Sequence, residues 1–91
     1  MTWEEKLDAL SALGDCNIKM RKPGDWYVSQ STEIGGNGML EGDYGNGKTP
    51  IEAIEDHWSK LVDNLPSDRH VRAYDNKRYR WSGYMWKEVS K

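Results

Sequence analysis

Residues 49–66 read TPIEAIEDHWSKLVDNLP, and this stretch decides the fold. Thr49, Pro50 and Glu52 together form a helix start, because threonine caps the first turn, proline suits its first position and the glutamate reaches back to the cap. Apolar residues then recur at three- and four-residue steps until Pro66 ends the pattern. The sequence therefore predicts an amphipathic helix with one buried stripe. That stripe comprises Ile51, Ile54, Trp58, Leu61, Val62 and Leu65.

The residues just before this helix match a phosphate-binding pattern. Residues 42–49 read GDYGNGKT, which satisfies G-x-x-x-x-G-K-[ST]. In a true phosphate-binding loop the threonine is already helical, but Pro50 disfavours the helical conformation at Thr49. Residues 38–41 also lack the continuous apolar run of a buried parallel strand. We therefore predict a glycine-rich turn that enters the helix, and no nucleotide site.

The rest of the chain contains one further helix and several short strands. Thr2 and Glu5 form a capping box ahead of a second apolar stripe, which ends at Gly14. Period-two alternation between turn residues predicts the strands. Those expected before the 49–66 helix cover residues 16–21, 26–30 and 39–41. Those expected after it form two linked hairpins over residues 71–74, 77–81 and 84–89.

This order predicts an α+β fold. Two helices with matching apolar stripes would pack on one face of a small antiparallel sheet, in the order α-β-β-β-α. Residues 1–65 would form this αβββα core, and residues 67–91 a basic, aromatic β-hairpin extension at the C-terminus. A chain of 91 residues supports one modest core, so residues 1–91 are expected to form a single domain.

Composition excludes several functional classes. No apolar run approaches the roughly 18 residues that span a bilayer, so no membrane partner is expected. The N-terminal residues do not resemble a secretory signal, and Cys16 is the only cysteine, which favours a reducing, cytoplasmic setting. His57 and His70 have no second ligand at metal-binding spacing. We therefore expect no metal, no cofactor and no catalytic site.

Charge and aromatic residues together single out the C-terminal segment. Acidic residues outnumber lysine and arginine over residues 1–66, and the balance reverses over residues 67–91. The chain has five tryptophans, five tyrosines and no phenylalanine, which favours half-exposed rings over an ordinary core. The candidate binding residues are Arg72, Lys77, Arg78, Tyr79, Arg80, Trp81, Tyr84 and Trp86. Two other interpretations stay open: the rings form the inner face of a hairpin, or the charges fold back on the protein's own acidic helices.

A resemblance to a known family accompanies this order of elements. The glycine-rich stretch running into the helix over residues 45–53 is similar to the double-stranded-RNA-binding domain, over residues 1–65. That family places phosphate-binding lysines at this helix start, whereas this chain has Lys48 followed by Pro50, Ile51 and Glu52. Glu52 would repel phosphate there.

A second resemblance is to small, unannotated phage-encoded proteins. It rests on the WYV of residues 26–28, the glycine-rich turn and the T-P-x-E-A helix start at residue 49. It implies a protein of the infected bacterial cytoplasm.

Together these features predict a small, non-enzymatic binding protein. The first hypothesis is a phage-type accessory protein or inhibitor that binds a host or phage protein complex, because aromatic and arginine residues dominate the centres of such interfaces. The alternative is a nucleic-acid-binding module that uses the basic, aromatic C-terminal hairpin, since this mixture both follows a phosphate backbone and stacks on bases.

Overall fold

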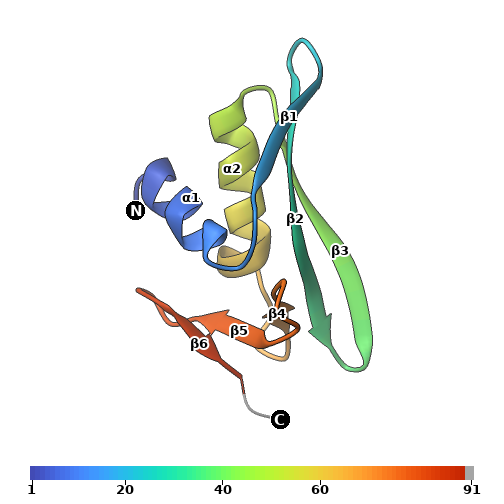
Figure 1. The fold of residues 1–91 in the computed structure, drawn as a ribbon, viewed down its shortest axis with the longest axis vertical. Coiled ribbons are helices and arrows are strands. Elements are labelled where there is room, and N and C mark those ends of the chain that lie inside the picture. The colour runs from blue at the N-terminus through green and yellow to red at the C-terminus, as the bar shows by residue number, and fades with distance from the viewer. Residues whose placement is uncertain (90–91) are drawn as a thin grey trace.

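The computed structural model describes residues 1–89, which form two α-helices and a six-stranded antiparallel sheet. In chain order the elements are α1 (Trp3–Ser11), β1 (Asn17–Lys22), β2 (Asp25–Gly36), β3 (Met39–Gly47), α2 (Pro50–Trp58), β4 (His70–Arg72), β5 (Arg78–Trp81) and β6 (Trp86–Glu88). A π-helical segment, Ser59–Asp63, continues α2. Figure 1 shows both helices on one side of the sheet, with β4, β5 and β6 crossing one end of the helix pair. The predicted α+β fold, with an αβββα order and C-terminal strands, is confirmed.

Both helices begin where their caps predict. The Thr2 side chain accepts a hydrogen bond from the Glu5 backbone, and the Glu5 carboxylate accepts one from the Thr2 backbone at 2.9 Å. At α2, the Thr49 side chain accepts from the Glu52 backbone at 3.1 Å, and Pro50 occupies the first helical position. A cap of this kind depends only on residues within one turn, which is why sequence alone locates it.

Strand β2 organises the sheet. It is much longer than the expected strand over residues 26–30, because its two halves have different neighbours. One edge pairs first with β1 and then with β4, and the other edge pairs with β3. Between these halves, residues 30–32 of β2 lie opposite the single residue Asp43 of β3. Such a bulge bends a strand, and here it separates the part of the sheet under the helices from the part that continues into β4–β6.

The prediction of a glycine-rich turn before α2 is wrong, because the structure has strand β3 there. Residues 42–47 belong to this strand, and only Lys48 and Thr49 connect it to α2. A Cβ atom at Gly45 would lie 2.2 Å from the carbonyl oxygen of Ala53, and one at Gly47 would lie 2.5 Å from the Glu52 side chain. The glycines are therefore sites where α2 lies directly on the strand, which local sequence patterns do not reveal.

The core lies between the helices and the sheet and continues under the C-terminal strands. Trp58 is only 2% exposed, as its place on the apolar stripe predicts, whereas Ile51 is 45% exposed and lies outside the core. Trp58 contacts both Trp81 and Trp86 edge to face, with ring centroids 5.1 and 6.2 Å away. The buried apolar residues are Leu10, Leu13, Val28, Ala53, Ile54, Trp58, Leu61, Val71 and Ala73.

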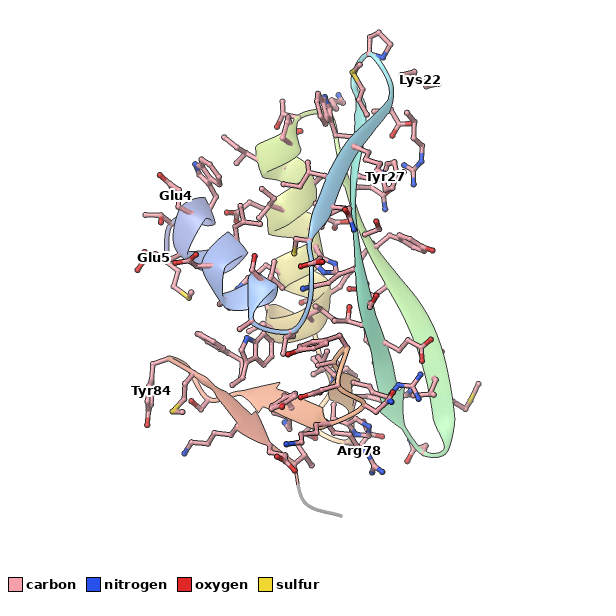
Figure 2. The ribbon with its side chains drawn as sticks, in the orientation of Figure 1. Glu4, Glu5, Lys22, Tyr27, Arg78 and Tyr84 are labelled. Atoms are coloured by element: carbon pink, nitrogen blue, oxygen red, sulfur yellow. The ribbon has the colours of Figure 1, made fainter. Side chains whose placement is uncertain are left out.

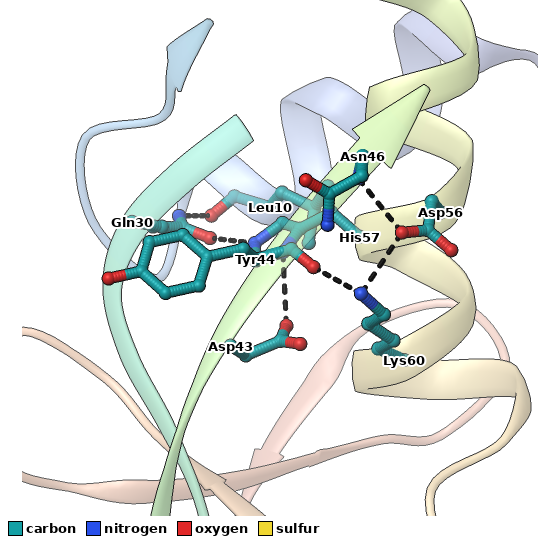
Figure 3. Close-up of polar contacts among 8 residues, drawn as sticks. All are labelled: Leu10, Gln30, Asp43, Tyr44, Asn46, Asp56, His57 and Lys60. Atoms are coloured by element: carbon teal, nitrogen blue, oxygen red, sulfur yellow. Dashed lines mark hydrogen bonds and ion pairs between the residues drawn. The ribbon is translucent and has the colours of Figure 1, made fainter. Parts of the chain in front are cut away.

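The outer edge of β3 is covered in part by side chains of the helical layer. The Asp56 carboxylate accepts a hydrogen bond from the Asn46 backbone at 2.9 Å, and the Lys60 ammonium donates to the Tyr44 carbonyl. Asp56 and Lys60 also pair with each other at 3.0 Å (Figure 3). Two backbone groups of an edge strand thus have partners within the same chain.

Candidate binding surface on the open face of the sheet

The face of the sheet that carries no helix, called the open face below, follows from strand alternation. Val28 points into the core, so its neighbours Tyr27 and Ser29 point away from the helices. The same rule applies around the buried Val71, whose neighbours His70 and Arg72 lie on the open face. Paired residues share a face, which extends the assignment to the other strands. The charged and aromatic residues assigned in this way are Lys19, Arg21, Asp25, Tyr27, Glu33, Tyr44, His70, Arg72, Arg78, Arg80 and Lys87.

The open face is basic, although the chain carries a net charge of −2. Asp25 and Glu33 both lie on this face, and each contacts an arginine: Asp25 pairs with Arg21, and Glu33 with Arg72. The helical layer carries the opposite charge, with acidic residues in the first turn of each helix. Figure 2 shows Glu4 and Glu5 on α1, on the side remote from β2 and β3, whereas Tyr27 lies by β1 and β2 and Arg78 lies at the lower end by β5. The fold therefore separates charge between its two layers.

An arginine and two tyrosines mark one end of the open face. The Arg21 guanidinium lies over the Tyr27 ring, 4.2 Å from its centroid, and donates to the Asn46 side chain at 3.0 Å. Tyr44 is paired with Ser29 on the neighbouring strand and is 54% exposed. A stacked, hydrogen-bonded guanidinium is held in one orientation, so this end offers flat, ordered surfaces to a ligand.

Arginines dominate the other end of the open face. Arg72 pairs with Glu33 on the adjacent strand. Arg80 donates hydrogen bonds to three carbonyl oxygens in the loop between the π-helical segment and β4, and so stabilises that loop. The acceptors are the carbonyls of Pro66, Ser67 and Arg69. The Arg78 side chain has no hydrogen bond or ion pair among residues 1–89. Of these three arginines, Arg78 is therefore the one free to meet a ligand.

The structure divides the predicted site residues between two faces. The cations Arg72, Arg78 and Arg80 lie on the open face, and Lys77 is exposed in the β4–β5 turn. Tyr79, Trp81 and Trp86 instead pack against the core, and the Trp86 indole donates to the Ala9 carbonyl at 2.7 Å. Tyr84, in the β5–β6 turn, is 74% exposed. Thus most of the predicted rings form the inner face of the hairpin, and the aromatic residues of the open face are Tyr27 and Tyr44.

The acidic side chains of α2 are engaged elsewhere. Glu55 pairs with Lys6 of α1 at 2.6 Å, and Asp56 pairs with Lys60. The arginines of the C-terminal strands therefore do not fold back on these carboxylates. Their intramolecular partners are Glu33 and the backbone of residues 66–69.

A buried polar network under the sheet is a feature that the sequence analysis missed. The Gln30 amide nitrogen donates to the carbonyls of Leu10 and Gly14, so its oxygen must accept from His57 Nε2, at 2.9 Å. His57 Nδ1 lies 3.0 Å from Asp43 Oδ2, close enough for an ion pair but not aligned for a hydrogen bond (Figure 3). Nε2 therefore donates to Gln30, while Nδ1 faces the Asp43 carboxylate in the same enclosed space.

Neither this network nor Cys16 forms a reactive site at the surface. His57 is 0% exposed, so a substrate cannot reach its ring. Burial raises the pKa of the Cys16 thiol to about 11, with a smaller contribution from the charge of Asp15, and a protonated thiol is a poor nucleophile. No group of three or more metal-ligating side chains occurs among the described residues. Within the same part of the chain, no helix is long and apolar enough to cross a membrane.

Comparison with known proteins finds no match for this chain among protein-family models, curated proteins or solved structures. The resemblances to the double-stranded-RNA-binding domain and to phage-encoded proteins therefore stay predictions. At the start of α2, where that domain places lysines, the Glu52 carboxylate accepts a hydrogen bond from the Lys48 backbone at 3.1 Å. An acidic group thus occupies the position at which a helix start would receive a phosphate.

Proposed function

We propose that this protein binds single-stranded nucleic acid on the open face of its sheet. The observation that carries the proposal is the separation of charge. A net acidic chain presents lysines and arginines across one exposed sheet face, and both carboxylates on that face are neutralised by arginines. Phosphate contacts from such cations supply most of the affinity of nucleic-acid-binding surfaces.

A single strand fits this surface better than a duplex does. Proteins that bind single strands combine a positive surface with aromatic rings on which bases stack. Tyr44 provides a well exposed ring, and the Arg21 guanidinium stacked over Tyr27 provides a second flat surface on the neighbouring strands. A duplex keeps its bases stacked inside, so exposed rings on a sheet would add little to duplex binding.

Binding without catalysis agrees with the placement of the titratable groups. His57 and Asp43, which lie together, are enclosed by the helices and the sheet. General acid–base catalysis requires such groups to reach a substrate in a concave site.

The experiment is a titration of a fluorescein-labelled, mixed-sequence DNA 12-mer, followed by anisotropy at several salt concentrations. We expect Lys19→Glu and Arg78→Glu, at opposite ends of the open face, each to weaken binding about tenfold at ~0.1 M salt, which corresponds to about 1.4 kcal/mol. Each change should also reduce the slope of log affinity against log salt by about one. Neither side chain has a hydrogen bond or ion pair within residues 1–89, so the fold should tolerate both changes.

Lys48→Glu is the matched control, because it changes the net charge by the same amount at an exposed position at the start of α2. Equal losses in all three variants would show non-specific attraction and contradict an open-face site. A loss confined to Lys48→Glu would place the ligand at the helix start, as in the double-stranded-RNA-binding domain. Absence of binding at low salt would refute the proposal.

A protein partner is the second candidate, and it is favoured by a different surface. A groove of about 760 Å³ lies between α1 and the β5–β6 turn, with Trp81, Tyr84 and Met85 among its lining residues and the acidic Glu5 and Asp8 beside them. Tyr84 and Met85 are both exposed, which suits the centre of a protein interface. A partner complex captured from bacterial lysate should be lost in Tyr84→Asp and kept in Arg78→Glu, and the reverse pattern would assign the partner to the open face.

A further inference from the structure

A cationic cleft lies on the open face where the β2–β3 turn meets β4 and β5. Its volume is about 440 Å³, within the range of small-ligand sites. Residues from three separate parts of the chain line it, so it exists only in the folded protein. They are Gly36, Asn37, Gly38, Met39, Leu40, His70, Arg72, Asn76 and Arg78.

The charges in this cleft have one sign. They belong to Arg72 and Arg78, the titratable His70 lies beside them, and no carboxylate lines the cleft. Glu33 neutralises part of Arg72 from the neighbouring strand. Arg78 has no such partner within the described residues, which leaves the whole guanidinium fork available to an anion.

Gly35 leaves room for the His70 ring to line the cleft. These two residues are paired across β2 and β4, and a Cβ at position 35 would lie 2.7 Å from His70 Nε2 and 2.9 Å from the Leu40 side chain. Because glycine has no side chain, the imidazole can lie over the strand beside Leu40. This arrangement brings His70 to the same cleft as Arg78.

We propose that this cleft binds a single phosphate group, with Arg78 as its main cationic ligand, His70 beside it and Arg72 on the wall. The proposal rests on the function proposed above, since it assigns one phosphate of the nucleic acid to a discrete position. The cleft is larger than phosphate alone, so it also admits the attached sugar. The shared ligand chemistry is a phosphate monoester or diester, whatever molecule carries it.

Phosphate binding should be coupled to protonation of His70. Burial lowers the pKa of His70, and the positive charges of Arg78 and Arg80 lower it further, so the free protein disfavours protonation of the ring. The groups that face it are Arg78 and Arg80 from β5, with Gly35 and Leu40 from β2 and β3. A bound anion offsets the arginine charges and raises the pKa of His70. Anion binding should therefore become tighter as the pH falls and His70 takes up a proton.

The test follows the His70 ring and the backbone amides by NMR during separate titrations. The probes are inorganic phosphate, sulfate, glycerol 3-phosphate and uridine 5′-monophosphate, with chloride keeping the ionic strength constant. We expect saturable shifts at His70 and at residues 36–40 with phosphate. Sulfate keeps both charges between pH 7.5 and 5.5, so it isolates the contribution of the ring: its affinity should rise severalfold over this range in the wild type and stay constant in His70→Asn.

Arg78→Gln and Lys87→Gln are the matched pair. Both remove one charge from the open face, but only Arg78 lines the cleft. Arg78→Gln should lose at least tenfold in phosphate affinity while Lys87→Gln changes less than twofold, and both should melt as the wild type does. Equal effects of the two changes, or shifts that do not saturate, would overturn the proposal. Equal affinity for glycerol 3-phosphate and uridine 5′-monophosphate would show recognition of the phosphate alone, and a preference for the uridine compound would add the nucleoside.

The outcome is separable from that of the oligonucleotide experiment. A 12-mer that binds without shifting His70 or residues 36–40 leaves nucleic-acid binding intact and refutes the phosphate site. Saturable phosphate binding by a protein that does not bind the 12-mer supports the phosphate site and refutes the proposed function.

Discussion

Replacing Asp43 by alanine tests whether the buried network stabilises the fold. Asp43 Oδ2 lies 3.0 Å from His57 Nδ1, and the two side chains are 4% and 0% exposed. Apart from this contact, neither atom has a hydrogen-bond partner within the described residues. In Asp43→Ala the imidazole would therefore have no polar neighbour at Nδ1, while Gln30 would still hold Nε2.

The expected cost follows from the contact that His57 would lose. In Asp43→Ala, Nδ1 would be a buried nitrogen without a polar partner, and an unsatisfied buried polar group costs about 1 to 3 kcal/mol. We therefore expect a loss of about 1 to 3 kcal/mol in the free energy of unfolding. At about 4 to 8 °C per kcal/mol for a domain of this size, the melting temperature should fall by roughly 4 to 24 °C.

Urea denaturation followed by tryptophan fluorescence, together with a calorimetric melt, measures both quantities. Asp63→Ala is the control, since the Asp63 side chain is exposed and makes no hydrogen bond or ion pair within residues 1–89; this variant should stay within about 0.5 kcal/mol of the wild type. Asp43→Asn should cost less than Asp43→Ala, because an asparagine amide keeps a polar neighbour at Nδ1. If Asp43→Ala were as stable as Asp63→Ala, the contact between Asp43 and His57 would contribute nothing to stability.

The other predictions concern β3 and the arginines of β5. Gly45→Ala should lose about 3 kcal/mol in urea denaturation, because its Cβ would lie 2.2 Å from a carbonyl oxygen of α2, whereas Gly42→Ala, with nothing within 4 Å, should be neutral. Arg80→Ala should cost about 1 to 2 kcal/mol through its lost carbonyl contacts, and Arg78→Ala less than 0.5; similar melting of the two would contradict these roles. Equilibrium dialysis with ATP and Mg²⁺ should give the same result for Lys48→Ala as for the wild type, and a selective loss would restore the phosphate-loop interpretation.

The parts of the fold that sequence predicts are those fixed within one turn or one strand. The caps at Thr2 and Thr49 and the burial of Trp58 follow from neighbouring residues or from a short period. Sequence wrongly predicts a turn at the glycines of β3, because these positions require glycine for tertiary packing against α2. A glycine under a crossing helix has the same local pattern as a glycine in a turn, and only the approach of Ala53 to Gly45 distinguishes them.

The candidate site was predictable in its charge but not in its extent. The basic residues of the C-terminal segment are visible in the sequence, and strand alternation separates Arg78 from Tyr79. Whether the rings or the cations face solvent depends on which face of the strands packs on the core. Here Trp81 and Trp86 pack against Trp58, so the rings face the core. Lys19, Arg21 and Tyr27 join the surface only because β2 links both ends of the sheet. The buried network around His57 is not predictable from local sequence, since its partners Gln30 and Asp43 are distant in the chain.

The covered edge of β3 bears on how the protein behaves when crowded with its own copies. Exposed edge strands recruit further strands, which is a common route to fibrils and domain-swapped aggregates. Here the Asp56 carboxylate already binds the Asn46 amide, and the Lys60 ammonium binds the Tyr44 carbonyl, so an incoming strand could pair with these two groups only by displacing an ion pair. At this part of the edge, side chains of the helical layer therefore oppose self-assembly without covering the open face of the sheet.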